Sequence, residues 1–268
     1  MKVLILGSTG MLGNAVAKEF SLHGIGEITK TLRRHTLNKE DRCFDATKHD
    51  LSTQCGADYD YVINCIGVIK PFINDNPYHS VYVNGAFPHK LSSWAKKNDI
   101  KMIHITTDCV FSGKDGNYTE ESVHDEVDFY GKSKSLGEPK DCMVLRTSII
   151  GEEIHKDASL IAWVKSQEGN TINGFTNHLW NGVTTNQYGK ICMEIMKKGL
   201  YEEGLFHVFS PTPVNKFELV SSINDRFNLN ITIVRTKADL AVDRTLSTNE
   251  GLNGALSIPE IPEQIKNL

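Results

Sequence analysis

The 268-residue sequence lacks the features that mark membrane, secreted and nucleic-acid-binding proteins. No apolar run approaches the ~18 residues of a membrane span, and the apolar stretch after Met1 is too short for a signal peptide. A basic block is also absent, since 29 Lys and Arg residues stand against 33 Asp and Glu residues and give a net charge of −4. We therefore expect a globular cytoplasmic protein that binds neither a membrane nor nucleic acid.

Paired cysteines are missing as well. The sequence contains no C-x-x-C motif and no run of histidines near a cysteine, so neither a zinc site nor a disulfide framework is expected. Reduced thiols and no bound metal are the expectation for such a chain. The six cysteines are Cys43, Cys55, Cys65, Cys109, Cys142 and Cys192.

Short apolar runs alternate with helix-like segments over the first 150 residues. Continuous apolar strands that alternate with helices are typical of a parallel sheet covered by helices on both faces. The expected fold class is therefore α/β, with a Rossmann-type doubly wound parallel sheet. The expected strands are residues 3–6, 27–32, 42–44, 61–65, 101–106 and 142–146, and the expected helices are residues 11–22, about 81–97 and one that begins near Tyr130.

The pattern loosens after residue 150, where residues 173–185 are rich in Asn, Gly, Thr and Trp. The sequence contains no internal repeat and no linker long enough to separate autonomous domains. Helices are expected over residues 185–198 and 216–227, and strands over residues 207–210 and 231–234.

A glycine-rich turn, Gly7-Ser8-Thr9-Gly10-Met11-Leu12-Gly13, follows the first expected strand and opens the first expected helix. Glycines let the backbone turn sharply and approach a ligand, and the free N–H groups of a helix N-terminus can bind a pyrophosphate. The glycine spacing differs from the G-x-G-x-x-G pattern, and a tight strand-to-helix connection is the alternative. The position within a βαβ pattern favours dinucleotide binding, with Gly7, Thr9, Gly10, Met11, Leu12 and Gly13 as contact residues.

The end of the second expected strand indicates which dinucleotide fits. An NAD enzyme usually carries an acidic residue there, which binds the ribose 2′-hydroxyl. This chain has Arg33 and Arg34 instead, and two guanidinium groups suit a 2′-phosphate. We therefore expect NADPH as the cofactor and leave NADH open. A pair of solvated surface arginines is the alternative.

A tyrosine and a lysine have the spacing of an acid–base pair. Tyr130 and Lys134 are four residues apart and share one face of a helix, whereas Lys132 points elsewhere. A phenol with a pKa of about 10 is a poor acid at neutral pH unless a nearby cation stabilises the phenolate. Lys134 would supply that charge. An exposed helix face is the alternative for this pair.

Thr106-Thr107-Asp108 come at the end of the strand expected at residues 101–106. The carboxyl edge of an α/β sheet is where ligands bind, and a hydroxyl there can polarise a substrate carbonyl toward hydride attack. A hydrogen-bonded turn that ends the strand is the alternative.

Taken together, these segments resemble the extended short-chain dehydrogenase/reductase family, and more narrowly its dTDP-4-dehydrorhamnose reductase branch. The resemblance covers roughly residues 1–150 well and the rest of the chain loosely. Its specific part is the run Thr-Asp-x-Val-Phe-x-Gly followed by Tyr-Gly-Lys-x-Lys. The residues that carry it are 7–13, Asn64-Cys65-Ile66-Gly67, Val83-Asn84-Gly85, 106–113, 130–134 and Leu145-Arg146-Thr147-Ser148.

The resemblance implies a catalytic set and a cofactor site. Thr107 would orient the keto group, Tyr130 would donate a proton to the carbonyl oxygen, and Lys134 would lower the pKa of Tyr130 and hold the nicotinamide ribose. The cofactor itself would deliver hydride. Asn84 would brace the active-site strand, with a helix-surface Asn as the alternative. The further cofactor-binding residues would be Asp45, for which a helix N-cap is the alternative, and Cys65, Ile66, Gly67, Thr106, Tyr130 and Lys134.

The resemblance also implies substrate contacts, where this chain departs from the family. The family usually has an aromatic residue after Thr-Asp, and this chain has Cys109, for which a buried inert thiol is the alternative. A packed tryptophan and a surface arginine are the alternatives for Trp180 and Arg244. The substrate-binding residues would be Thr107, Asp108, Cys109, Val110, Trp180 and Arg244.

The expected function is NAD(P)H-dependent reduction of a nucleotide-activated 4-keto-6-deoxysugar for deoxysugar and polysaccharide biosynthesis. The expected partner is a nucleoside-diphosphate sugar, and a homodimer is left open. An epimerase or dehydratase of the same fold is one alternative, although Cys109 replaces the Glu that the related dehydratases usually carry. A non-catalytic dinucleotide-binding regulatory subunit is the other, although it need not keep Thr107, Tyr130 and Lys134.

The predicted organisation has two parts. Residues 1–150 form a dinucleotide-binding Rossmann domain, and a helix and strand at about 184–210 return to it. Residues 151–183 and 211–268 form a small substrate-binding lobe.

Overall fold

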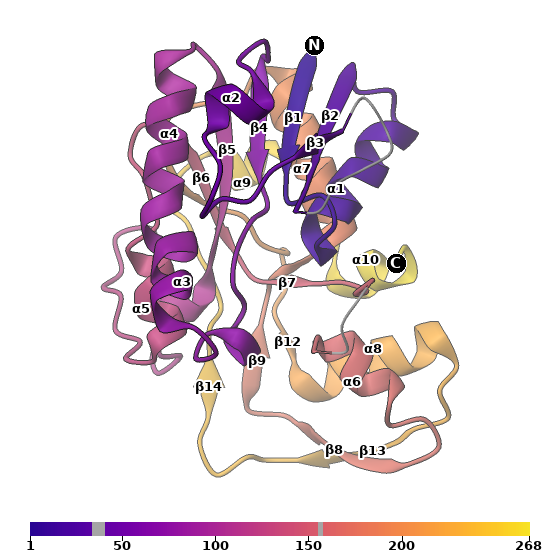
Figure 1. Ribbon diagram of the computed structural model, residues 1–268. Coiled ribbons are helices and arrows are strands. Elements are labelled where there is room, and N and C mark those ends of the chain that lie inside the picture. The colour runs from indigo at the N-terminus through magenta and orange to yellow at the C-terminus, as the bar shows by residue number, and fades with distance from the viewer. Residues whose placement is uncertain (34–40, 155–157) are drawn as a thin grey trace.

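A parallel β-sheet forms the centre of the computed structural model, which describes residues 1–33, 41–154 and 158–268 (Figure 1). Seven strands of these residues pair in the order β11-β6-β5-β4-β1-β2-β3, and every pairing is parallel. The predicted doubly wound parallel sheet is therefore confirmed. The strands are β1 (Lys2–Leu6), β2 (Glu27–Leu32), β3 (Arg42–Cys43), β4 (Tyr61–Asn64), β5 (Lys101–Thr107), β6 (Met143–Thr147) and β11 (Gly204–His207).

The strand order reverses between β1 and β4, because β2 and β3 extend the sheet on one side and β5 and β6 on the other. Val3 of β1 pairs with Tyr61 of β4, and Leu6 of β1 pairs with Asn64 of β4. In open α/β sheets the crevice at such a switch point, outside the carboxyl ends of the strands, binds ligands. The topology therefore places the glycine turn after β1 beside the segment after β4.

Helices cover both faces of the sheet, as Figure 1 shows. Alternate strand residues point to opposite faces, so Val3 and Ile5 enter one core cluster while Leu4 and Leu6 enter the other. The first cluster is closed by α1 (Met11–Leu22) and α7 (Thr185–Lys198), and the second by α2 (Leu51–Cys55) and α4 (Phe87–Lys97). Each face is thus a continuous apolar surface beneath amphipathic helices.

A smaller lobe lies beyond the carboxyl ends of the strands, at the bottom of Figure 1. Its core cluster includes Ile161, Leu219 and Ile223. The strands β8 and β13 pair parallel, β9 lies between β12 and β14, and β7 pairs with β10. The elements of this part are β7 (Ile149–Ile150), α6 (Leu160–Lys165), β8 (Thr171–Phe175), β9 (His178–Trp180), β10 (Val183–Thr184), β12 (Val214–Asn215), α8 (Lys216–Phe227), β13 (Thr232–Thr236), β14 (Val242–Asp243) and α10 (Ile261–Lys266).

The chain crosses between the two parts several times. Helix α7 packs against α1, and β11 pairs with β6 at the edge of the sheet. Leu252 of the short helix α9 (Leu252–Ala255), together with Leu256, joins the core cluster beneath α1 and α7. Helix α7 and strand β11 are therefore the helix and strand that were expected to return to the sheet at about 184–210. The strand occupies residues 204–207 rather than 207–210. The division into two domains stays a prediction.

The helix predicted at about residues 81–97 is divided into α3 (Pro77–Val81), a π-helical turn (Tyr82–Ala86) and α4. Pro88 lacks the N–H group that would donate to the carbonyl of Asn84, which therefore loses its α-helical partner. That carbonyl faces Gly137, where an added Cβ would lie 1.8 Å from the Asn84 oxygen. Asn84 lies in this turn and its side chain is buried. Such π-helical turns occur frequently at functional sites.

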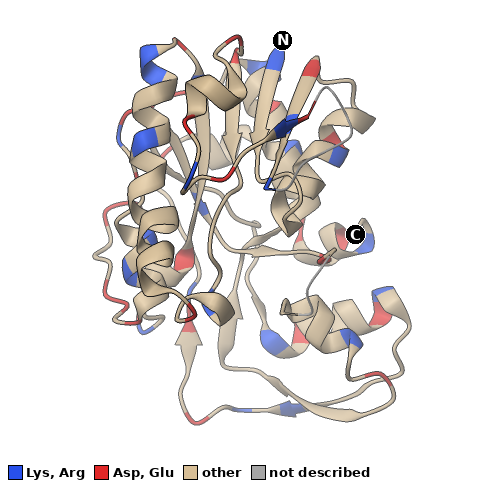
Figure 2. Cartoon of the chain, in the orientation of Figure 1, with Lys and Arg blue, Asp and Glu red and all other residues tan. Residues whose placement is uncertain are grey.

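Charged residues lie mainly on the outer helices and loops (Figure 2). In the central strands β4, β5 and β6, the residues with formal charge are Lys101, at the exposed start of β5, and Arg146, which is fully buried. In the part of the chain that the structure describes, no helix is both long and apolar enough to cross a membrane.

The lobe cluster predicts a large loss of stability on truncation. Ile223→Ala is expected to lower the free energy of unfolding by about 2–5 kcal/mol, because Ile223 is fully buried on α8 and truncation leaves a cavity. Leu240→Ala is the control, because Leu240 is 77% exposed. Urea unfolding followed by circular dichroism measures both variants. Equal free energies for the two variants would contradict this packing.

Candidate functional site

The glycine turn brings the start of α1 against the end of β1. Gly7 has φ of +79°, and a Cβ at Gly13 would lie 2.3 Å from the Gly7 oxygen, so both positions need glycine. The Gly10 N–H donates to the Gly7 oxygen at 3.0 Å. Gly10 is the N-cap of α1 and no side chain caps this end of the helix. The uncapped first turn of this 12-residue helix can accept an anionic group.

The turn is fastened to the end of β2. The Gly7 N–H donates to Thr31 Oγ1 at 3.0 Å, and Ser8 Oγ donates to the Thr31 oxygen at 2.9 Å. Two residues further on, Arg33 is exposed. Burial raises the pKa of Asp45, but hydrogen bonds from Thr47 and, to a smaller extent, the charge of Arg33 outweigh it, so the pKa is lowered. Arg33 and the glycine turn therefore lie at the same edge of the sheet. Arg34 lies outside the described residues.

Asp45 forms a local turn in this structure. Its Oδ1 accepts hydrogen bonds from the backbone N–H of Thr47 at 2.9 Å and from Thr47 Oγ1 at 2.7 Å. The N-cap of the following helix α2 is Asp50. The N-cap alternative for Asp45 is therefore wrong, and contact with an adenine ring stays a prediction.

The segment after β4 forms the opposite wall of the crevice. A Cβ at Gly7 would lie 3.0 Å from Ile66 and 3.3 Å from the backbone of Cys65. Asn84 holds the end of this segment, because its Nδ2 donates to the Val68 oxygen and its Oδ1 accepts from the Val68 N–H. A Cβ at Gly67 would meet one neighbour, Asn84 Oδ1 at 3.6 Å. The backbone at Gly67 is therefore open on the side that a Cβ would occupy.

Helix α5 (Phe129–Ser135) carries the predicted acid–base pair. Asp128 caps its start by accepting a hydrogen bond from the Gly131 N–H at 2.7 Å. Gly131 allows a close approach to the loop after β5, since a Cβ there would lie 2.5 Å from the Cys109 oxygen. Lys134 is 6% exposed, whereas Lys132 is exposed to solvent. The structure therefore directs the two lysines to different faces, as the spacing predicted.

Burial moves the pKa values of this pair in opposite directions. It lowers the pKa of Lys134 to about 8, and the charge of Glu138 opposes the shift. Lys134 Nζ donates to the Ile105 oxygen at 3.2 Å. Burial raises the pKa of Tyr130, as do the neighbouring Cys109 and Asp108, while the Thr107 hydroxyl lowers it. At neutral pH the phenol is therefore protonated, but the expectation that Lys134 lowers the pKa of Tyr130 is not met: that pKa is raised, and Lys134 is not among the principal influences on it.

The polar residues after β5 lie beside Tyr130. Thr107 and Asp108 are buried, and Thr107 Oγ1 donates to Asp108 Oδ1 at 3.2 Å while accepting from the Cys109 N–H at 3.1 Å. Burial raises the pKa of Asp108, although Arg244 opposes it. Thr106 Oγ1 is buried without a hydrogen-bond partner among the described residues. An unpaired buried hydroxyl at the carboxyl edge is consistent with a ligand-binding position.

The remaining predicted substrate residues have different surroundings. Arg244 donates from Nη2 to Glu126 Oε2 at 2.8 Å and from Nε to the Phe111 oxygen at 2.9 Å. Its charge acts on Asp108 and Cys109, so it borders the site. Cys109 has a pKa raised to about 12 by burial, which matches the inert thiol alternative.

Val110 and Trp180 pack against other side chains. Val110 is buried in a cluster with Phe111 and Leu246, so its side chain has no free face for a substrate. Trp180 packs against the lobe cluster, and a Cβ at Gly182 would lie 2.4 Å from its ring. Their substrate contacts stay predictions, and the alternative of a packed tryptophan agrees with the geometry.

Two residues of this region were not predicted. Glu126 binds Arg244 and lies against Gly131, and Ser133 accepts a hydrogen bond from Asn84 Nδ2 at 3.1 Å. Ser133 occupies the variable position of the Tyr-Gly-Lys-x-Lys motif, so it lies within a segment that the prediction had already singled out, although the motif does not specify it. Glu126 lies 118 residues from Arg244, and nothing in the local sequence links the two.

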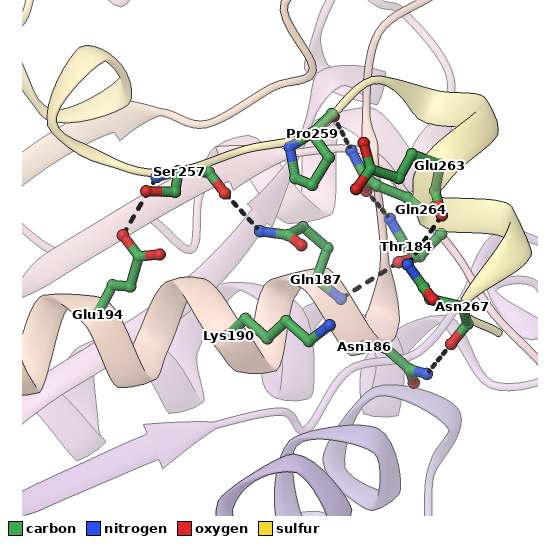
Figure 3. Close-up of a pocket in the computed structure, with 10 residues that line it drawn as sticks. All are labelled: Thr184, Asn186, Gln187, Lys190, Glu194, Ser257, Pro259, Glu263, Gln264 and Asn267. Carbon is green, nitrogen blue, oxygen red and sulfur yellow. Dashed lines mark hydrogen bonds between the residues drawn. The ribbon is translucent and has the colours of Figure 1, made fainter. Parts of the chain in front are cut away.

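A pocket between α7 and the C-terminal segment does not contain any of the predicted site residues (Figure 3). Its volume is about 150 Å³, smaller than the roughly 300–1,000 Å³ of most small-molecule sites. The polar groups around it bind one another: Gln264 accepts from the Thr184 N–H, and Asn186 donates to the Asn267 oxygen. These bonds attach α10 to the start of α7. Among residues 1–33, 41–154 and 158–268, no cluster of acidic, His or Cys side chains could hold a metal ion.

Comparison with known families and proteins gives matches over most of the chain, among them the following. The family described as RmlD substrate binding domain matches residues 1–245. A probable low-salt glycan biosynthesis reductase, Agl14, from Haloferax volcanii is 25% identical over 266 residues, covering 91% of this chain and 86% of the relative. Methionine adenosyltransferase 2 subunit beta from Danio rerio is 26% identical over 247 residues, covering 85% of this chain and 74% of the relative.

A solved structure shares the fold along the whole chain. The dTDP-4-dehydrorhamnose reductase of Bacillus anthracis, in complex with NADP, has a TM-score of 0.77 at 18% identity. The similarity covers 99% of this chain and 97% of that one. At this identity the likeness establishes the doubly wound fold with its additional lobe.

The pKa of Lys134 predicts a pH-dependent stability difference. Because the folded value is about 8 against an ordinary 10.5, the unfolded chain binds more protons between these values, and stability rises with pH through this window. Lys134→Met removes the buried charge and is expected to raise the free energy of unfolding by about 3 kcal/mol at pH 7. This gain should shrink as the pH rises from 8 toward 10.5.

The measurement is urea unfolding at pH 7 and pH 9.5. Lys132→Met is the matched control, because Lys132 lies exposed on the same helix and should show no such pH-dependent difference. A gain for Lys134→Met that is equal at both pH values would contradict the buried ammonium.

Proposed function

Because the chain belongs to the RmlD substrate-binding-domain family, we propose that it is an NADPH-dependent reductase of a nucleotide-activated 4-keto-6-deoxysugar, with NADH as a second donor. The observation that carries this proposal is the arrangement of α5: Tyr130 and Lys134 lie beside Thr107 at the sheet edge that also holds the glycine turn. The reductase name of the Haloferax relative and the NADP in the Bacillus structure support it.

Different residues of the crevice would bind different parts of a dinucleotide. The first turn of α1 would bind the pyrophosphate, because its N–H groups are uncapped. Arg33 and Arg34 would bind a 2′-phosphate, and Lys134 would hold the nicotinamide ribose. When bound, the nicotinamide supplies hydride. The remaining contacts would come from Gly7, Thr9, Gly10, Met11, Leu12, Gly13, Asp45, Cys65, Ile66, Gly67, Thr106 and Tyr130.

Tyr130 would act as the acid. The phenol is protonated at neutral pH and would give its proton to the substrate oxygen as the keto group is reduced to an alcohol; because burial raises its pKa and makes it a weaker acid, this transfer would depend on a nearby cation. The charge on Lys134 would stabilise the phenolate until solvent returns the proton. Thr107 would turn its hydroxyl from Asp108 to the keto oxygen and orient it.

Nucleotide recognition would come from the lobe and the loop after β5. Asp108 and Cys109 lie beside Tyr130, Arg244 acts on both of them, and Val110 and Trp180 would complete the set. Arg244 keeps Nη1 free of any hydrogen bond to a described residue and could bind a diphosphate oxygen through it. The product would be a nucleotide-linked deoxysugar for polysaccharide assembly.

A non-catalytic dinucleotide-binding subunit is the second candidate. The specific observation in its favour is the 26% identity with methionine adenosyltransferase 2 subunit beta, which is named as a subunit of another enzyme. A dehydratase has less support, because Cys109 replaces the acidic residue that the related dehydratases usually carry. An epimerase would hold NAD tightly, so NAD bound to the purified protein would favour it. A reductase would use a buried lysine close to a protonated phenol, whereas a regulatory subunit would not need this pair.

A homodimer and a cytoplasmic location are further parts of the proposal. Exposed apolar side chains gather where α3 and α5 meet the π-helical turn, including Tyr78, Val81, Phe129 and Leu136, and a second copy could cover them. The six cysteines are free, as expected in a reducing compartment.

Tyr130→Phe separates the two candidate functions. If Tyr130 is the acid, NADPH oxidation at 340 nm with a panel of nucleotide 4-keto-6-deoxyhexoses should fall by about 10²-fold or more, because the proton donor is lost. The Kd for NADPH should stay within about twofold. Tyr78→Phe, on the exposed surface, is the control and should retain full turnover. Equal turnover of Tyr130→Phe and the wild type would remove Tyr130 from the chemistry, and no turnover by the wild type would favour the subunit.

Arg33→Ala tests the choice of cofactor. Loss of a charged hydrogen bond to the 2′-phosphate should raise the Kd for NADPH about tenfold. The Kd for NADH should not change, because NADH has no phosphate there, and so NADH is the internal control. Fluorescence titration of both cofactors measures the effect. A parallel loss for both cofactors, or for neither, would contradict a role in phosphate recognition.

A further inference from the structure

Arg244, which follows β14, is held by the protein along one edge of its guanidinium group. Its Nε donates to the Phe111 oxygen at 2.9 Å, and its Nη2 donates to Glu126 Oε2 at 2.8 Å. Nε and Nη2 share one edge of the planar group, so the two bonds together fix its plane. The Nη1–Nη2 edge keeps N–H groups free of any hydrogen bond to a described residue. Such an edge, with two parallel N–H groups, matches the oxygens of a phosphate.

Glu126 is itself fixed, so it can hold Arg244 in one place. Its side chain is 13% exposed, and its Oε1 accepts from the Val127 N–H at 2.8 Å and from the Asp128 N–H at 3.2 Å. The N–H of Glu126 donates to the Val110 oxygen at 3.1 Å. The backbone thus uses one carboxylate oxygen and the arginine uses the other. A carboxylate held at both oxygens is a firmer support than an exposed ion pair, which opens easily.

The pair of Glu126 and Arg244 lies against the start of α5. A Cβ at Gly131 would lie 2.7 Å from Glu126 Cγ, and Gly131 directly follows Tyr130 in the chain. Asp128, whose N–H binds Glu126, caps the same helix by accepting from the Gly131 N–H at 2.7 Å. The free edge of Arg244 is therefore attached, through Glu126, to the helix that carries the proposed acid.

We propose that Glu126 is a positioning residue for substrate binding, which holds the guanidinium of Arg244 with its Nη1–Nη2 edge toward the diphosphate of a nucleotide sugar. This inference rests on the proposed function for the class of substrate. The role of Glu126 itself rests on its hydrogen bonds to Arg244 and to the backbone before α5. That role is in binding, so loss of Glu126 should raise KM and leave kcat nearly unchanged.

Charge and geometry predict opposite effects of removing this carboxylate. By charge alone, a carboxylate near a phosphate site repels the anion, so its removal should tighten binding. By geometry, its removal frees a long side chain that binding must order again, which weakens affinity by up to about tenfold. Carboxylate and phosphate would meet different edges of the guanidinium, with the positive charge between them. We therefore expect the geometric effect to be the larger one.

The direct test is calorimetric titration with UDP, dTDP and GDP, in the presence of saturating NADP⁺ so that the nucleotides do not enter the dinucleotide crevice. The diphosphate that the wild type binds most tightly is then titrated into the variants. We expect Glu126→Gln to raise its Kd about tenfold. An unchanged or lower Kd would overturn the proposal. Glu121→Gln is the matched control and should keep the wild-type Kd, because Glu121 is an exposed carboxylate of the same loop that binds Asn249.

A double-mutant cycle shows whether Glu126 acts through Arg244. Arg244→Ala removes the proposed phosphate ligand and should raise the Kd more than Glu126→Gln does. In the Arg244→Ala background, Glu126→Gln should have no further effect, because no guanidinium is left to position. A further rise of about tenfold in that background would assign the effect to the shape of the loop and would overturn the proposal.

A second variant covers a failure of Glu126→Gln to fold. Arg244→Lys keeps the positive charge but loses the planar group that can bind Glu126 along one edge and a phosphate along another. Its Kd for the diphosphate should rise about tenfold. A wild-type Kd would overturn the proposal, because it would show that charge without a fixed edge is sufficient.

These titrations need no turnover, so they separate this inference from the reductase activity. Diphosphate binding that Glu126→Gln weakens, with no reduction of any sugar, would contradict the reductase and support the role of Glu126. Sugar reduction with diphosphate binding that the variant leaves unchanged would do the reverse. If the wild type binds none of the three diphosphates, both the class of substrate and the role of Glu126 are overturned.

Discussion

The attachment of α5 to the carboxyl end of β5 determines where Tyr130, Lys134 and Thr107 lie relative to one another. Local helix propensity cannot provide it, because α5 has only seven residues and short helices are marginal in water. Buried polar contacts hold the helix instead, and they join the helix segment to β5, to β6 and to the π-helical turn. They are Lys134 to the Ile105 oxygen, Asn84 to Ser133, His104 to the Gly137 oxygen, and Arg146 to Glu138.

The same burial has two consequences for chemistry. It raises the pKa of Tyr130, which favours the protonated acid, and it lowers the pKa of Lys134 to about 8, which weakens the charge needed once the proton has left. A deeper site would raise the first pKa and lower the second further, so burial favours neither the release of the phenol proton nor the charge on the lysine.

The sequence predicted those features whose causes are local. The bounds of α1 and α7 match the prediction, because apolar periodicity and the flanking Gly10 and Thr184 define them. The i, i+4 spacing predicted that Lys134 and not Lys132 turns inward. The doubly wound parallel sheet and the resemblance to the dTDP-4-dehydrorhamnose reductase branch are also confirmed. The prediction missed contacts between residues that are far apart in the sequence. Asn84 binds Ser133 across 49 residues and Arg146 binds His207 across 61. No repeating pattern in the sequence indicates such pairs.

The most direct test of the proposed function follows the hydride itself. The wild-type protein is incubated with NADPH that carries deuterium on the transferable position of the nicotinamide and with each nucleotide 4-keto-6-deoxyhexose of the panel. The account predicts a product with a single deuterium on the former keto carbon, seen by mass spectrometry and located by NMR. Tight binding of the labelled NADPH with no deuterium in any sugar would contradict a reductase and leave a dinucleotide-binding protein with another task.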